Sequence, residues 1–268
     1  MPCDMLDWTR TSAARLAQVS LFLFALAAPG AAAVDGQAAL AASDAIRNPQ
    51  QPFSVTITLT EFEKGVQVET STFQGFARTL EAGGQFASLL RYLQPARDSG
   101  KLMLKSGSDM WFFDPASKAS IRVSPQQRLM GQAANGDVVT VNFASDYKVT
   151  SSSEDDITDG ERRPRKAQKL LLVATNENAT YGSIELWLDA ERHAPIKVQF
   201  LSDSGRLLKT AFYRRFQRQL GADRPTETVI IDGLRPTSVT IVRFSDYTAR
   251  KIPVTWFQRD HLPRFQPD

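Results

Sequence analysis

The sequence predicts a mainly β protein, built as a sandwich or a barrel, from three observations. Apolar and polar residues alternate from Phe53 to Thr60, which is the pattern of a strand with one buried face. Further short apolar segments follow at regular spacing, and most are separated by Gly, Pro, Asn or Asp. Helix signals are scarce, so the series does not fit alternating βαβ units.

The first 33 residues are expected to be a secretory signal peptide. Arg10 and Arg15 precede an apolar segment at 19–28, and Pro-Gly and three alanines follow, which predicts cleavage near Ala33. The apolar segment is shorter than the roughly 20 residues that cross a bilayer, although an uncleaved N-terminal anchor is the alternative. We therefore expect residues 34–268 to form a single exported domain.

Cysteine usage points to the bacterial periplasm. Cys3 is the only cysteine and lies inside the predicted signal peptide, so no disulfide is expected in the mature chain. An exported domain without disulfides depends on burial and sheet hydrogen bonds, which is easier to achieve in the periplasm than for a small extracellular module. A lipoprotein signal would need its cysteine directly after the apolar segment, so lipid anchoring is not expected.

The predicted elements follow one another along the mature chain. Ala39, Ala42 and Ile46 have helical spacing and predict a short helix over 36–47, which Asn48-Pro49 ends. A hairpin turn at 63–65 separates the first two strands, and the alternation slips near Thr70, which indicates a bulge. Strands are predicted at 53–60, 66–78, 86–93, 101–105, 110–113, 120–123, 147–152, 169–175, 181–189, 196–201, 207–217, 226–232, 238–247 and 251–257.

Two segments interrupt the strand pattern. In residues 131–148, Asn135 or Asp137 is a candidate helix cap, and Val138, Val141 and Phe143 fall near one side of the resulting helix. Because so short a helix is marginal alone, it is expected to lie against the sheet or over its opening. The charged segment 151–166 is predicted to be a solvated hairpin loop.

Composition and motifs argue against several classes of function. The chain has 268 residues, 42% of them hydrophobic, which excludes a disordered protein, and its net charge of +3 is too small for a surface that follows phosphates. His193 and His261 lie far apart without a neighbouring Cys or His, and no catalytic or phosphate-binding motif is found. We expect no enzyme, no metal, no cofactor and no nucleic acid partner. A hydrolase of lipids or cell-wall material is the weakest alternative, because it would need a carboxylate pair or a Ser–His set.

Aromatic residues are plentiful, with a triplet at 111–113 and others on separate predicted strands. A curved sheet around an apolar ligand cavity would use them. An ordinary filled β core would use them equally well. The residues alone do not decide between these two possibilities.

Several motifs resemble the outer-membrane lipoprotein-sorting (LolA-like) proteins. They are LMLKSGSDMWFFDP at 102–115 and IRVSPQQRLMG at 121–131, followed in order by Asp146-Tyr147, IELWLD at 184–189, PIK at 195–197 and SGRLLK at 204–209. The resemblance covers most of residues 50–262. It implies an unclosed antiparallel β-barrel with helices over its concave side and an apolar cavity that holds acyl chains of a lipoprotein or lipid.

The resemblance also assigns site residues. It places the helix near 138–143 in a lid and the strand at 53–60 in the cavity wall. Arg78 is the candidate lid contact, since carriers of this family hold the lid with a basic residue near the cavity mouth; a plain surface arginine is the alternative. The candidate ligand-binding residues are apolar positions on these and other elements: Phe53, Val55, Ile57, Leu59, Phe76, Leu102, Leu104, Trp111, Phe113, Val138, Val141, Phe143 and Trp187.

The predicted function is that of a monomeric periplasmic carrier. It would accept acyl chains from an inner-membrane transporter and release them to an outer-membrane acceptor. At roughly 0.8 kcal/mol per buried CH₂, one long chain gains on the order of 10 kcal/mol before the costs of binding. The alternative is an accessory or interaction subunit of an inner-membrane exporter, with a barrel packed by its own side chains. The volume of the interior separates the two.

Overall fold

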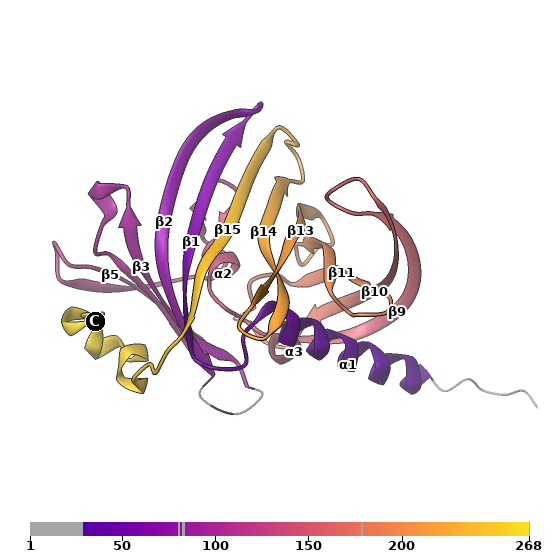
Figure 1. The fold of residues 1–268 in the computed structure, drawn as a ribbon, viewed down its shortest axis with the longest axis horizontal. Coiled ribbons are helices and arrows are strands. Elements are labelled where there is room, and N and C mark those ends of the chain that lie inside the picture. The colour runs from indigo at the N-terminus through magenta and orange to yellow at the C-terminus, as the bar shows by residue number, and fades with distance from the viewer. Residues whose placement is uncertain (1–28, 80, 82–83, 178, 268) are drawn as a thin grey trace, which may run out of the picture.

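The computed structural model describes residues 29–79, 81, 84–177 and 179–267 (Figure 1). Within these residues, thirteen strands form one antiparallel sheet and two more form a separate small hairpin. The strands of the large sheet are β1 (Phe53–Glu63), β2 (Val66–Thr79), β3 (Phe86–Gln94), β4 (Leu102–Ser106), β5 (Asp109–Asp114), β6 (Ala119–Val123), β9 (Tyr147–Thr158), β10 (Pro164–Ala174), β11 (Ser183–Asp189), β12 (Pro195–Leu201), β13 (Leu207–Gln219), β14 (Ala222–Asp232) and β15 (Ser238–Ala249).

The remaining elements cover the sheet or link its strands. The small hairpin consists of β7 (Arg128–Met130) and β8 (Ala133–Ala134). The α-helices are α1 (Pro29–Arg47), α2 (Asn135–Val138) and α3 (Phe143–Asp146), and the 3₁₀ helices are η1 (Ala96–Asp98), η2 (Val254–Phe257) and η3 (Arg259–Arg264). No helix in the described part of the chain combines the length and the apolar character needed to span a bilayer.

The strand order across the sheet is β6-β5-β4-β3-β2-β1-β15-β14-β13-β12-β11-β10-β9. Every neighbouring pair is consecutive in the chain except β1 and β15, which pair from Phe53 opposite Ala249 to Glu63 opposite Ser238. The sheet therefore consists of two meanders joined at its centre, and β6 and β9 remain as separate edges. This arrangement confirms the predicted mainly β fold with an unclosed antiparallel barrel.

The sheet curls strongly, as Figure 1 shows. Register shifts mark bulges in several strand pairs, and one falls in the β1–β2 hairpin beside Val68, two residues from the predicted position at Thr70. Bulges increase the local twist of a sheet. Gly75 contributes as well, because a Cβ atom there would lie 3.2 Å from Val55 Cγ1 and 3.3 Å from Ile57 Cδ1. The missing side chain lets β1 and β2 curve around their own apolar residues.

The concave face carries the larger apolar core. Phe53, Val55, Ile57 and Leu59 alternate along β1 and are at most 5% exposed, as the period of two predicts. Helix α1 covers part of this face through contacts with β9, β14 and α3, with Leu40 fully buried. The sheet therefore buries a continuous apolar surface on its inner side.

The convex face has its own apolar cluster, covered by the C-terminal segment. Phe76 of β2 lies under Trp256 of η2, with ring centroids 5.2 Å apart and planes at 86°. Ile252, Phe257 and Leu262 complete the cover. In Figure 1 this yellow segment lies beside β3 and β5, away from α1. Both faces of the same strands are thus buried on this side of the sheet.

Two predicted elements differ from the structure. Residues 251–257 were predicted to be a strand, but the 3₁₀ helix η2 forms at their end, where the adjacent residues Trp256 and Phe257 are both buried, which does not fit the alternation of a strand. The predicted loop at 151–166 is a turn only at 159–163. Its flanks continue β9 and β10, where opposite charges such as Lys166 and Asp156 pair across the strands.

The N-terminal and lid predictions have different outcomes. Residues 1–28 of the predicted signal peptide lie outside the described residues, and Ala33 falls within α1. The helix predicted near residues 138–143 is divided into α2 and α3, because residues 139–142 between them are not helical. Both short helices lie against the concave face, as expected.

Leu59 tests the concave core. Leu59→Ala should lower the free energy of unfolding by about 2–5 kcal/mol, because it leaves a cavity at a fully buried position. Val68→Ala, at a position that is 61% exposed on the neighbouring strand, should change it by no more than about 0.5 kcal/mol. Urea denaturation of both variants measures the difference. Similar losses for the two variants would contradict this description of the core.

Candidate functional site

A pocket lies on the concave face, between the sheet and the segment 135–146, which we call the lid. Its volume is about 110 Å³. It is lined by Arg47, Asn48 and Pro49 at the end of α1, by Phe53, Val55 and Ile57 of β1, by residues 136–141 and Phe143 of the lid, by Thr180 and Tyr181, and by Phe200, Ala211, Tyr213, Pro225, Thr228, Ile230, Val242, Phe244 and Tyr247 of β12–β15. Most of these side chains are apolar or aromatic.

The size of the pocket limits what it holds with the lid in place. An apolar cavity of about 150 Å³ holds a benzene-sized group, so this pocket has room for a short apolar group rather than for a whole acyl chain. Val138 and Phe143 of the lid are 3% and 8% exposed and form one wall. Displacing the lid would therefore uncover apolar surface on the sheet and on the lid itself.

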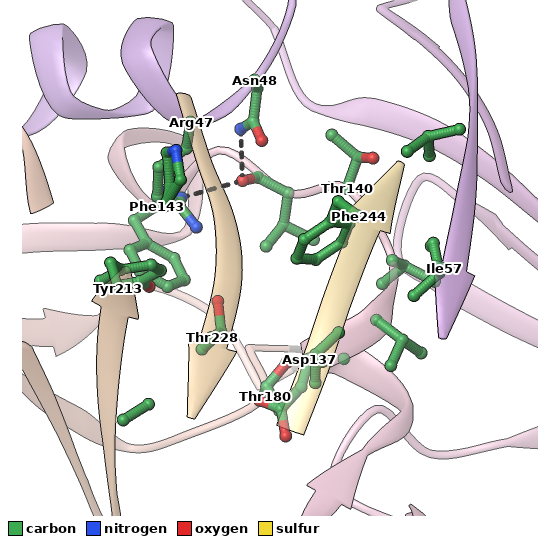
Figure 2. Close-up of a pocket in the computed structure, with 18 of the residues that line it drawn as sticks. Arg47, Asn48, Ile57, Asp137, Thr140, Phe143, Thr180, Tyr213, Thr228 and Phe244 are labelled. Carbon is green, nitrogen blue, oxygen red and sulfur yellow. Dashed lines mark hydrogen bonds between the residues drawn. The ribbon is translucent and has the colours of Figure 1, made fainter. Parts of the chain in front are cut away.

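The end of α1 holds the lid at its C-terminal part. Asn48 Nδ2 donates hydrogen bonds to Val141 O at 2.8 Å and to Asn142 Oδ1 at 2.9 Å. Arg47 donates to the same Val141 oxygen at 3.1 Å, and both bonds to this oxygen are drawn in Figure 2. The Arg47 guanidinium also lies 3.9 Å from the centre of the Phe143 ring, where a cation–π contact is favourable.

Arg47 keeps its positive charge despite its burial. Desolvation lowers the pKa of Arg47, but the Asp44 carboxylate and the Tyr213 hydroxyl outweigh it, and the net pKa is raised. Asp44 is an ion-pair partner of Arg47 and also accepts a hydrogen bond from the lid, from Ala144 N at 2.7 Å. The same carboxylate thus fixes the cation and the start of α3.

Asp137 and Lys209 hold the lid at its other end. Their side chains form an ion pair and are only 8% and 7% exposed. Asp137 also accepts hydrogen bonds from the Tyr181 hydroxyl and from Ala134 N, both at 2.7 Å. Lys209 Nζ donates a further bond to Gln132 O at 2.9 Å. Each charge is therefore paired and hydrogen-bonded, which is the condition for a buried ion pair to be tolerated.

A third set of contacts comes from the start of β3. Gln85 Nε2 donates to Asn142 O at 3.1 Å, and Gln85 Oε1 accepts from Asn142 N at 2.7 Å. Ser88 Oγ donates to Thr140 O at 3.2 Å. These side chains satisfy backbone groups of residues 140–142, where the lid is not helical. The lid is thus fastened mainly by polar contacts around an apolar interior.

The structure brings together only part of the predicted ligand-binding set. Six of these residues line the pocket: Phe53, Val55, Ile57, Val138, Val141 and Phe143. Leu59 belongs to the same core but is fully buried beyond the pocket.

The other predicted residues lie on the opposite face. Phe76, Leu102, Leu104 and Phe113 pack under the C-terminal segment, and Trp111 lies at its margin. Trp187 packs in a third cluster and donates a hydrogen bond from Nε1 to Asp155 at 2.7 Å. The inward residues of these strands include Met103, Met110 and Leu186. Both faces of β4, β5 and β11 carry apolar residues, so alternation alone does not identify the inner one.

The basic residue at the lid is not the predicted one. Arg78 donates a hydrogen bond to Ile252 O at 2.9 Å and so contacts the C-terminal segment. The lid contacts are made by Arg47 and Lys209. Lys209 and Asp137 are too far apart in sequence for any local pattern to link them. Arg47 and Asp44, by contrast, are three residues apart on α1, a spacing that places two helical side chains together.

Within the described residues, no group of His, Cys, Asp and Glu is arranged to hold a metal ion.

A LolA superfamily protein from Nitrosomonas europaea is 32% identical to this chain, and their structures share a TM-score of 0.74 over 84% of this chain and 98% of the other. The chain belongs to the LolA superfamily. This finding confirms the resemblance drawn from the motifs.

Further comparisons show the same fold in a second solved structure and a match to one family model. A domain from Vibrio parahaemolyticus, assigned to the outer membrane lipoprotein-sorting proteins, is 20% identical, with a TM-score of 0.71 over 87% of this chain and all of the other. At that identity the likeness shows the fold alone. The profile of a family described as "Uncharacterized protein" matches residues 84–264. No curated protein matches the chain.

Lys209 tests the fastening of the lid in this LolA superfamily protein. Lys209→Met should lower the free energy of unfolding by about 3–5 kcal/mol, because it leaves the Asp137 carboxylate buried without its cation. Lys166→Met removes the cation of an exposed pair, with Lys166 and Asp156 81% and 71% exposed, and should have a much smaller effect. Thermal or urea unfolding measures both. Equal effects would contradict a buried pair at the lid.

The tyrosines predict a response to high pH. The chain has five tyrosines, and burial raises the pKa of each above its ordinary value of 10.0; they are Tyr92, Tyr147, Tyr181, Tyr213 and Tyr247. Below about pH 10 both states keep these protons. Above it only the unfolded chain loses them, so their contribution to stability falls as the pH rises.

A spectrophotometric titration with parallel circular dichroism checks this response. Tyrosinate absorbance should appear only when the chain unfolds, whereas the chain in denaturant should titrate near pH 10. A tyrosinate signal near pH 10 with an unchanged dichroism spectrum would show that these hydroxyls are not buried as described.

Proposed function

We propose that the protein is a periplasmic carrier, which binds acyl chains of a lipoprotein or lipid in the concave pocket. It would take them from an inner-membrane transporter and pass them to an outer-membrane acceptor. The observation that carries the proposal is an apolar pocket beneath a lid that is fastened by polar side chains. Membership of the LolA superfamily supports the same carrier-like role.

The free energy of burying an acyl chain exceeds that of the hydrogen bonds of Asn48 and Gln85 to the lid, which favours a lid that opens for a chain. Each buried CH₂ group contributes about 0.8 kcal/mol, and apolar residues of β12–β15, such as Phe200 and Ile230, line the pocket. The hydrogen bonds of Asn48 and Gln85 to the lid can be replaced by water when the lid moves, and each contributes only about 0.5–1.5 kcal/mol net. A long chain therefore offsets the loss of these contacts. Its transfer breaks no covalent bond, so the proposed role requires no catalytic residue.

The second candidate is a non-catalytic accessory or interaction subunit of an inner-membrane exporter. The small volume of the pocket, about 110 Å³, favours this candidate, because an interior filled by its own side chains has no place for cargo. The two candidates differ in whether the lid moves aside for a ligand.

Extraction of the mature protein tests the carrier directly. The protein is purified without detergent, and mass spectrometry is run on what enters the organic phase. Stoichiometric lipid would support the carrier and identify its cargo. A clean extract, together with no binding of a fluorescent fatty acid, would favour the accessory subunit.

A matched pair of variants locates the site. Thr228 lines the pocket, and its neighbour Val229 on β14 is not among the lining residues. Thr228→Phe should fill the space and weaken binding of a fluorescent fatty acid by about tenfold or more, whereas Val229→Phe should leave the affinity near that of the unmodified protein. Equal affinities in a fluorescence titration of the two variants would place the probe elsewhere.

A further inference from the structure

A second hollow of about 710 Å³ lies beside the pocket. It is formed where the turns between β9 and β10, β11 and β12, and β13 and β14 come together, and we call it the arginine groove. Its lining contains six arginines, namely Arg163, Arg165, Arg192, Arg214, Arg215 and Arg218, but only three carboxylates. Asp189 and Glu227, which are not lining residues, pair with four of these arginines, so the local excess of positive charge is smaller than the lining alone indicates.

Some of these arginines maintain the shape of the groove. Arg163 and Arg165 both pair with Asp159 in the β9–β10 turn, at 3.3 and 3.4 Å. Arg165 also pairs with Asp189, which Arg192 approaches to 3.6 Å. These contacts connect two of the turns, so this side of the groove is built from paired charges.

The other side is short of negative charge. Arg214 and Arg215 reach the same Glu227 oxygen through their Nε atoms, at 3.5 and 3.3 Å, and Arg243 takes the other oxygen at 3.0 Å. Glu227 is 2% exposed, and one carboxylate does not balance three guanidinium groups. Arg214 Nε is buried without a hydrogen-bond partner among the described residues. Arg218 is 72% exposed, and its Nη1 atom lies as far as 3.9 Å from Asp223 Oδ1. This ion pair is therefore weak.

The backbone of Arg215 has an uncommon conformation. Its φ of 51° is in the left-handed region, which is uncommon for a residue with a side chain. The β13–β14 ladder omits this position and resumes at Phe216, while Thr226 Oγ1 donates a hydrogen bond to Arg215 O at 2.6 Å. Such a conformation persists only where the surrounding structure imposes it, and six other non-glycine residues of the described chain share a positive φ.

The groove and the pocket are adjacent. Tyr213 lines both, and Ile46 lines the groove while the next residue, Arg47, lines the pocket. Tyr213 and the end of α1 lie between the two hollows, so a single molecule that occupied both would have to pass over Tyr213. Arginine forks pair well with phosphate oxygens, and the groove is larger than a single ion needs.

We propose that the arginine groove binds the phosphate of a lipid headgroup while the chain of the same lipid occupies the pocket. This assignment rests on the acyl-chain function proposed above and narrows its cargo to lipids with a phosphate. Arg214, Arg215 and Arg218 supply the binding nitrogens. The ion pairs of Arg163 and Arg165 hold the opposite wall.

The test compares three soluble probes: monododecyl phosphate, monolauroylglycerol, which has a chain of equal length without charge, and inorganic phosphate. They are titrated into the mature protein and into the double variant Arg215→Gln with Arg218→Gln. Arg214 is left unchanged because its Nε atom is buried, whereas Arg215, which also contacts Glu227, is 59% exposed. The control is Arg97→Gln with Arg122→Gln, two arginines outside the groove that are 69% and 62% exposed.

The double variant should bind monododecyl phosphate about tenfold or more weakly, with monolauroylglycerol and the control variant unaffected. Unchanged binding of monododecyl phosphate, with monolauroylglycerol still bound, would overturn the headgroup site and leave the carrier function intact. If inorganic phosphate binds as tightly as monododecyl phosphate and monolauroylglycerol does not bind, the source of the phosphate is a free ion. That result would overturn both the lipid assignment and the carrier function.

Discussion

β1 and β15 lie at opposite ends of the strand sequence, yet they pair along their length from Phe53 opposite Ala249 to Glu63 opposite Ser238. All other neighbours in the large sheet are consecutive in the chain. This single long-range pairing therefore joins two meanders into one curved surface. The pocket depends on it, because its wall takes Val55 and Ile57 from one meander and Val242 from the other.

A curved sheet has two faces, and this chain covers them by different means. The convex side is closed by aromatic packing of Trp256 and Phe265 on Phe76. The concave side is closed by a lid whose fastenings are largely hydrogen bonds and one buried ion pair, Lys209 with Asp137. Hydrogen bonds can be replaced by bonds to water, whereas buried apolar area cannot be exposed without cost. The proposed carrier function therefore assigns opening to the concave cover.

Alternation along β1 identified the strand and its inner face, because the other face of β1 is polar. The same pattern was ambiguous in β4, where Leu102 and Leu104 face outward and Met103 faces inward. The spacing of Val138, Val141 and Phe143 predicted one short helix where the structure has two, and the resemblance to the LolA-like proteins, rather than the spacing, assigned this segment to a lid. No local pattern contained the long-range contact that holds the lid, since Lys209 on β13 and Asp137 are 72 residues apart in the sequence.

The crystal structure of the protein with its extracted lipid tests the central claim most directly. The account predicts an acyl chain on the concave face, in contact with Tyr213 and Phe244, and a lid segment 135–146 displaced from Asn48. A chain bound on the convex face, between Leu104 and the C-terminal segment, would contradict it. So would a lipid held at the sheet edge with the lid unmoved.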